Sequence, residues 1–202
     1  MQVMPAIVNQ VAQQTVRDQR GSVSAHYQRV FDAHAGPRSR HEQLDFIGVY
    51  RDGNLVSVRV TNDVTDGKAA TPAQIAQVIS DYEHPKPTDS FHAPWDPRYL
   101  GDYTYRTVDS NTIAFTSHIN DTAHGSGMFS FDAHKHVVAY RYTPSAFYDH
   151  ATAGTVVGRR AQVLSGYWAL TQETQTFRGH YTLFAGGATA QISQSDFRRL
   201  PG

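Results

Sequence analysis

Histidine is the residue type with the most evident chemical potential in this chain, which has eleven histidines and no cysteine. An imidazole ring binds metal ions and transfers protons near neutral pH. Without cysteine, a thiolate zinc site and a disulfide framework are both excluded. Three short clusters place histidines close to one another or to an aspartate: His118, Asp121 and His124; His134 and His136; Asp149 and His150.

None of these clusters has the spacing of a known metal motif, because a metal ion needs three or four converging ligands and each cluster supplies at most two locally. A joint site would combine His118, His124, His134 and His136. These residues flank opposite ends of one predicted strand, about 25 Å apart. We therefore predict solvated turn histidines, no metal ligand, no cofactor and no catalytic residue. The alternative is a hydrolase or metal-dependent enzyme that uses clustered His and Asp at strand turns.

Serine and arginine offer weaker possibilities. Ser126 lies between two glycines but lacks the strand, turn and helix of a nucleophile elbow. The pairs Arg159-Arg160 and Arg198-Arg199 each place one guanidinium on either face of a strand. An inward guanidinium needs an acidic partner or the carboxylate or phosphate of a bound head group.

Aromatic residues give the strongest indication of binding, since ligand pockets are mostly apolar and aromatic. They gather in the second half of the chain and in one proline-rich segment. A tightly packed core is the alternative explanation for many of them. We predict that the cavity wall or its lid includes Phe46, Tyr82, Phe91, Trp95, Tyr99, Phe115, Phe129, Phe131, Tyr140, Trp168, Phe177 and Tyr181.

Most of these aromatics lie on segments whose apolar pattern repeats every two residues, which predicts strands with one buried face. In Gly125–Asp132, Phe129 and Phe131 face one way and Met128 faces the other. Asp52-Gly53 is a strong hairpin signal. Turns are also expected at Thr171–Thr174 and at Gly186-Gly187. The other predicted strands are Ser22–Ala35, His41–Arg51, Asn54–Thr61, Tyr103–Thr107, Thr112–Ile119, Val137–Tyr142, Val156–Leu170, Thr176–Phe184 and Ala188–Leu200.

Two helices and one loop are expected to cover the sheet. Pro5–Arg17 has apolar residues at helical spacing, and so has Thr71–Glu83, which begins with a Thr–Gln capping box. Asn62–Ala70 reads as a polar loop. His84–Gly101 is too rich in proline for a regular element and too aromatic for an idle linker, so we predict a packed covering loop.

The fold class that follows is a mostly β, α+β protein with one domain over residues 1–202 and a curved antiparallel sheet of about ten strands. A sheet of this size curls into a half-open barrel, and its concave face would hold an apolar cavity below the helices and loop. The formal net charge is zero, so no basic surface for nucleic acid is expected. The apolar runs are too short for a membrane-spanning helix.

This order of elements resembles the LolA/LolB lipoprotein-carrier superfamily, which includes the sensor domain of the RseB type. Gly127–Asp132, Val137–Pro144 and Val163–Trp168 lie where similar phrases lie in that group. The resemblance implies a half-barrel that binds a lipid, an acyl chain or another apolar ligand. It also implies a periplasmic or cell-envelope location, although no signal peptide is visible in this chain, and a lipoprotein or envelope protein as partner.

We therefore predict a non-enzymatic carrier or sensor of an apolar ligand. Besides the hydrolase or metal-dependent enzyme, a third possibility is a protein-interaction module that recruits a partner strand at an exposed sheet edge.

Overall fold

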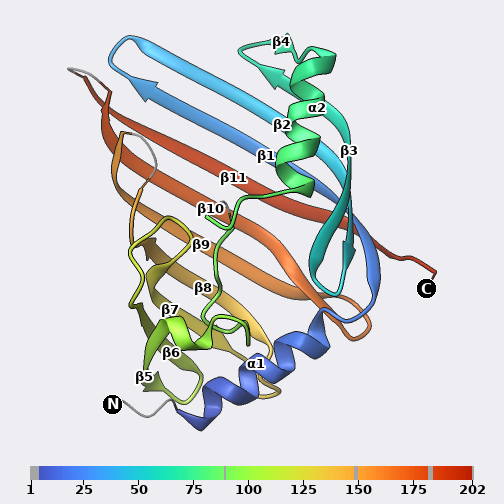
Figure 1. Cartoon of the computed structure of the whole chain (residues 1–202), viewed down its shortest axis with the longest axis vertical. Helices are drawn as coiled ribbons and strands as arrows, with labels where there is room; N and C mark the ends of the chain where they lie inside the picture. Colours follow the sequence, from blue (N-terminus) through green and yellow to red (C-terminus); the bar gives the residue numbers. More distant parts are fainter. Residues whose placement is uncertain (1–4, 89, 148–149, 182–183, 202) are drawn as a thin grey trace.

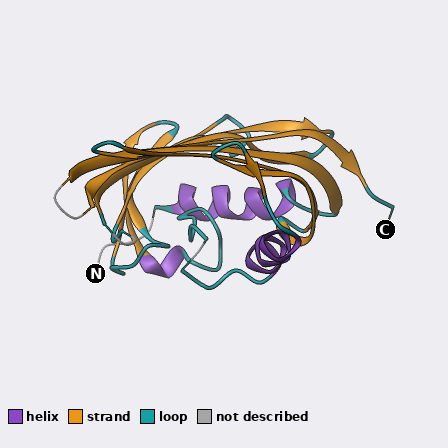
Figure 2. Cartoon of the chain, turned by 90° about the horizontal axis from the view of Figure 1, so that it is seen from above, coloured by secondary structure: helices purple, strands orange, loops and turns teal. Residues whose placement is uncertain are grey.

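The computed structural model describes residues 5–88, 90–147, 150–181 and 184–201. In these ranges one eleven-stranded antiparallel sheet carries both α-helices on its concave side (Figures 1 and 2). The fold class predicted from the sequence is confirmed. The elements are α1 (Ala6–Asp18), β1 (Ser22–Ala35), β2 (Arg38–Arg51), β3 (Asn54–Thr65), β4 (Lys68–Ala69), α2 (Pro72–Glu83), the 3₁₀ turn η1 (Leu100–Asp102), β5 (Tyr103–Asp109), β6 (Thr112–Ser117), β7 (Gly125–Phe131), β8 (Val137–Pro144), β9 (Ala151–Leu164), β10 (Tyr167–Tyr181) and β11 (Phe184–Arg199).

The strand order is β4-β3-β2-β1-β11-β10-β9-β8-β7-β6-β5, so the sheet is not closed into a barrel and ends at β4 and β5. The pairing of β1 with β11 joins the beginning of the chain to its end, from Val23 opposite Arg199 to Ala35 opposite Gly186. Figure 2 shows the sheet arching over the helices and the covering loop. Side chains on the concave face of the sheet therefore point toward the helices and the covering loop.

The strand boundaries follow the predicted pattern in the first half of the chain. β1 begins and ends as predicted, and the Asp52-Gly53 turn has positive φ at both residues.

The prediction that Asn62–Ala70 is a polar loop is wrong. β3 continues to Thr65, and a second Asp-Gly turn at Asp66-Gly67 adds the short β4. This extra hairpin raises the strand number from about ten to eleven.

The largest error concerns β9 and β10, where one strand was predicted over Val156–Leu170. The chain turns at Ser165-Gly166 instead, and Gly166 has φ of 67°. Apolar and polar residues alternate on both sides of this two-residue turn, so the pattern runs through it. The predicted turn at Thr171–Thr174 lies within β10.

The predicted turn at Gly186-Gly187 is also wrong, because both glycines belong to β11. A Cβ atom on Gly186 would stand 2.4 Å from the His34 carbonyl oxygen. This glycine pair therefore allows close approach of β11 to β1 rather than a change of direction.

The two helices differ in how firmly they are attached. α1 buries five side chains against the sheet: Val8, Val11, Ala12, Thr15 and Asp18. α2 has no fully buried residue, although its predicted capping box is present, with the Thr71 hydroxyl accepting from the Gln74 N–H and the Gln74 side chain accepting from the Thr71 N–H. Among the described residues, no helix has both the length and the apolar character needed to cross a bilayer.

Candidate functional site

The described residues form three buried apolar clusters, of which two lie under the helices and a third gathers around Val23, Tyr167 and Ala169. The first cluster fills the space between β5–β9, α1 and the covering loop. The second lies between β1–β3 and α2. A half-buried strip of β1, β11 and β10 separates them.

Most of the predicted ligand-binding residues belong to the first cluster. Phe129 and Phe131 are almost completely buried, and Phe115, Trp95 and Tyr140 are nearly so. Phe91 stacks on Tyr142 with ring centroids 3.8 Å apart, which fixes the loop on the sheet. Phe91, Tyr99 and Phe177 are only partly buried and pack against the edge of this cluster. The fully buried members form the core, and the partly buried ones keep part of their surface exposed to solvent.

Phe46 and Tyr82 belong to the second cluster. Phe46 is completely buried and stacks on Tyr27 with ring centroids 4.3 Å apart, and Tyr82 of α2 packs edge-on against both. The Tyr27 and Tyr82 hydroxyls lie 3.3 Å apart. These rings attach α2 to the sheet.

Trp168 belongs to neither cluster. Trp168 stacks on the His136 ring at a centroid distance of 4.4 Å. Tyr181 is the last residue of β10, and its side chain lies outside the described part of the structure.

The strip between the clusters carries apolar side chains on its concave side, together with Gln175 opposite Ala190 and Glu173 opposite Ile192. Phe31 lies opposite Ala190, and Ala33 lies opposite Ala188, which in turn lies opposite Phe177. Ile192 contacts the second cluster, and Phe177 contacts the first. We call this set the central strip: Phe31, Ala33, Phe177, Ala188, Ala190 and Ile192.

The convex side of β10 is polar throughout its second half. In β10 the outward residues are exposed, and the inward ones are half-buried. The outward side chains of β10 are Gln172, Thr174, Thr176, Arg178 and His180.

A shallow hollow lies at one end of the central strip. It has a volume of about 150 Å³, opens to solvent, and is lined in part by Ala35, Phe177, Gly179 and Ala188. A second open hollow of about 470 Å³ lies over β5–β7 between polar residues such as Thr104 and Ser126. Neither hollow encloses a ligand-sized space below the helices.

Polar groups mark the other end of the strip. Arg29 lies opposite Ile192, which lies opposite Glu173. The Arg29 Nη2 donates to Glu42 Oε2 at 3.3 Å, while its Nε is buried without a hydrogen-bond partner among the described residues. Glu173 accepts hydrogen bonds from the Tyr140 hydroxyl and the Gln175 amide. Burial, followed by the Glu173 charge, raises the pKa of Tyr140 well above its ordinary value.

The inward arginine that the sequence left open is Arg160, which is buried at the end of α1. Its Nη2 donates to the Trp168 carbonyl at 3.2 Å, and the negative charge of Asp18 lies nearby. Asp18 Oδ1 lies 2.8 Å from His136 Nδ1. Arg160 therefore has protein partners and needs no ligand head group, while Arg159, Arg198 and Arg199 are exposed.

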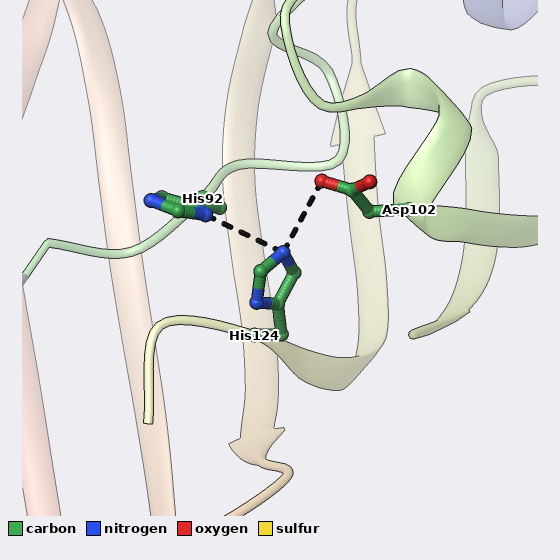
Figure 3. A group of neighbouring side chains, drawn as sticks. All are labelled: His92, Asp102 and His124. Carbon is green, nitrogen blue, oxygen red and sulfur yellow. Dashed lines mark hydrogen bonds and ion pairs between the residues drawn. The ribbon is translucent and has the colours of Figure 1, made fainter. Parts of the chain in front are cut away.

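The structure brings together three residues that the sequence does not associate. His92 comes from the covering loop, Asp102 ends η1, and His124 precedes β7 (Figure 3). His124 Nε2 lies 3.4 Å from His92 Nδ1 and 3.3 Å from Asp102 Oδ2. One ligand atom from each residue lies within 4.8 Å of the others, so the three side chains are able to hold a metal ion.

The prediction that His124 is a solvated turn histidine is wrong, because only 3 % of its side chain is exposed. Its Nδ1 bonds Asp121 Oδ1 at 2.7 Å. Although burial raises the pKa of Asp121, the His124 side chain and backbone hydrogen bonds lower it overall. Burial, followed by the neighbouring His124, lowers the pKa of His92.

The remaining histidine clusters lie elsewhere. His118 and His134 are exposed, as predicted, whereas His136 is partly buried against Asp18 and Trp168. Asp149, predicted beside His150, lies outside the described residues.

Comparison with known proteins finds likeness in structure alone, since no family model and no curated protein matches the chain. Solved structures of the LolA superfamily are similar to it. A putative outer membrane lipoprotein-sorting protein domain from Vibrio parahaemolyticus is 14 % identical with a TM-score of 0.48, covering 96 % of this chain and 92 % of that one. A LolA superfamily protein from Nitrosomonas europaea is 12 % identical with a TM-score of 0.38, covering 98 % and 96 %.

A DUF1329 family protein from Desulfovibrio piger is also similar, with 12 % identity, a TM-score of 0.43 and coverage of 100 % and 95 %. The LolA group is the one that the order of elements in the sequence resembles. At these identities and TM-scores the likenesses concern the fold and say nothing of a ligand or partner.

Proposed function

We propose that this protein is a non-enzymatic lipid-binding protein of the cell envelope, and that one acyl chain lies along the central strip. The observation that supports this most directly is the contrast between the two faces of the same strands. The side chains of the central strip are apolar and, apart from the buried Ala190, half-buried, whereas the convex side chains of β10 are polar. An apolar face that the fold itself leaves partly uncovered gains free energy when an apolar ligand covers it.

The dimensions of the strip suit a single extended chain. From Arg29 to Ala35 the strip spans six residue steps of β1, which is about 20 Å. A bilayer's hydrocarbon core is about 30 Å thick, so one lipid chain extends about 15 Å. The alanines at 33, 188 and 190 leave room for the chain between Phe31 and Phe177.

The polar end of the strip favours an anionic head group. Arg29 holds a buried Nε without a partner in the described part of the chain, and its charge is only partly matched by Glu42. A carboxylate accepts two parallel hydrogen bonds from a guanidinium. A fatty acid fits this arrangement if its carboxylate bonds Arg29 at the polar end of the strip and its tail extends toward the hollow at Phe177.

This function is tested by displacement of a fluorescent fatty acid with palmitate. Ala188→Glu places a charge on the strip, and Gln191→Glu places the same charge on the exposed convex face of the same strand. We expect the first variant to weaken palmitate binding at least about tenfold, because the tail would then have to lie against a carboxylate. The second variant controls for general repulsion between the added charge and the ligand.

A second comparison tests the head group. Arg29→Met is expected to weaken palmitate binding and to leave hexadecanol binding unchanged. The proposal is wrong if the native protein does not bind palmitate, or if Ala188→Glu and Gln191→Glu have the same effect.

A further inference from the structure

The spacing around His124 Nε2 is that of ligands around a shared ion. A tetrahedral zinc ion with bonds of about 2.0–2.1 Å to nitrogen and oxygen holds its ligand atoms about 3.3–3.4 Å apart. The distances from His124 Nε2 to Asp102 Oδ2 and to His92 Nδ1 are 3.3 and 3.4 Å. Both exceed the usual length of a hydrogen bond to a histidine nitrogen.

The other nitrogen of His124 shows the contrast. Its Nδ1 lies 2.7 Å from Asp121 Oδ1, which is a good hydrogen bond. Metal-binding histidines nearly always donate their second N–H to a carboxylate or a backbone carbonyl, which orients the ring. Asp121 has this position for His124.

The site is rigid before any ion enters. The His92 N–H donates to the Ala123 carbonyl at 2.8 Å, and the Tyr103 hydroxyl donates to the His92 carbonyl. The His92 ring also stacks on Tyr99 with centroids 4.0 Å apart. These contacts fix the loop residue at the edge of the sheet, so little conformational entropy is lost when an ion binds.

We propose that His92 Nδ1, Asp102 Oδ2 and His124 Nε2 form a binding site for a divalent transition-metal ion of the zinc class. Two imidazoles and one carboxylate suit zinc and its neighbours, whereas calcium and magnesium prefer oxygen ligands alone. The ion joins the covering loop, η1 and the start of β7, and three protein ligands leave a fourth position open. The Asp102 side chain is 31 % exposed, which gives the ion access from solvent.

The same atoms have one competing explanation, in which His124 is a protonated imidazolium that bridges Asp121 and Asp102. This arrangement needs no metal ion and predicts that zinc binds no better here than at exposed histidines. Binding measurements separate the two because the chain has eleven histidines, and several lie far from this site.

The test is zinc titration of the metal-free full chain in competition with a chromophoric chelator. We expect one tight zinc ion per chain. His92→Gln and Asp102→Asn should each weaken it by more than about a hundredfold, because loss of an outer partner alone costs about ten- to a hundredfold. Asp121→Asn, which changes only a positioning residue, should cost about ten- to a hundredfold.

Matched controls are His134→Gln and His180→Gln, which remove exposed histidines outside the site and should leave the tight zinc ion unchanged. Circular dichroism of each metal-free variant separates loss of a ligand from loss of the fold. Cobalt substitution adds a readout of geometry, since a tetrahedral site gives strong visible absorption and an octahedral one does not. The proposal is overturned if the native protein has no tight zinc ion, or if the site variants bind zinc like the controls. It does not depend on the lipid-binding proposal, because no residue of the central strip takes part.

Discussion

The lack of a side chain at Gly158 makes room for the ring of Tyr140. Gly158 is opposite Tyr140 in the pairing of β8 with β9, and it is buried. A Cβ atom on Gly158 would stand 2.1 Å from Cζ of the Tyr140 ring. The absence of a side chain here lets the ring lie flat on the neighbouring strand and reach Glu173 with its hydroxyl.

Gly158→Ala is therefore expected to lower the free energy of unfolding by about 1–3 kcal/mol, the usual cost of forcing extra volume into a packed region. Urea denaturation followed by circular dichroism measures this change. Gly101→Ala is the control, because a Cβ atom there meets nothing within 4 Å. Equal effects of the two substitutions would show that the contact with Tyr140 is not what requires a glycine.

The two helices belong to the same concave face but are held by different amounts of buried surface. α1 buries Val8 and Val11 completely, and its last residue, Asp18, lies against His136. α2 contacts the sheet through the half-buried Val78, Ile79 and Tyr82 and through Glu83, whose Oε1 accepts from the Val58 N–H at 2.8 Å. Full burial of a valine contributes about 1.5–3 kcal/mol, so α1 is the more firmly attached helix.

Hydrogen exchange measured by mass spectrometry should therefore be at least about tenfold faster in α2 than in α1, which corresponds to about 1.4 kcal/mol of opening free energy. Thr71→Ala removes the cap of α2 and should increase exchange there about fivefold, since a lost cap costs about 1 kcal/mol. Exchange in α1 should stay unchanged. Equal protection of both helices would contradict the burial argument.

At the scale of the whole molecule, burial within the arch protects most of the tyrosines from ionisation. It raises the pKa of seven of the eleven tyrosines in the chain. These seven are Tyr27, Tyr50, Tyr103, Tyr105, Tyr140, Tyr142 and Tyr167. They come from five different strands, so their ionisation reports on the sheet as a whole.

A raised phenol pKa means that the folded chain keeps protons that the unfolded chain releases. The stability contributed by these groups is complete below about pH 10, where free tyrosine ionises, and it decreases as the pH rises further. Absorbance at 295 nm should show that the seven ionise at a higher pH than free tyrosine and only together with the loss of circular dichroism. Ionisation of all eleven near pH 10 with the fold intact would contradict this prediction.

The sequence by itself determined the local elements, because their signals lie within a few neighbouring residues. Alternation over Ser22–Ala35 and the Asp52-Gly53 turn specify a strand and a hairpin. The Thr71 capping box specifies the start of α2. Together these signals were enough for the fold class and for the resemblance to the LolA superfamily. The same local view failed at Ser165-Gly166, because alternation continues across a turn of only two residues.

Tertiary structure alone decided which aromatics are core and which remain partly exposed. Phe129 and Phe177 both lie on strands that alternate, yet the first is covered by Trp95 of the loop and the second belongs to the half-buried central strip. The association of His92, Asp102 and His124 was equally invisible, since the proline-rich loop brings together residues that are up to 32 positions apart. Periodicity records which face of a strand a residue occupies. Periodicity does not say which distant segment packs onto that face. The packing depends on long-range contacts that form only when the whole chain folds.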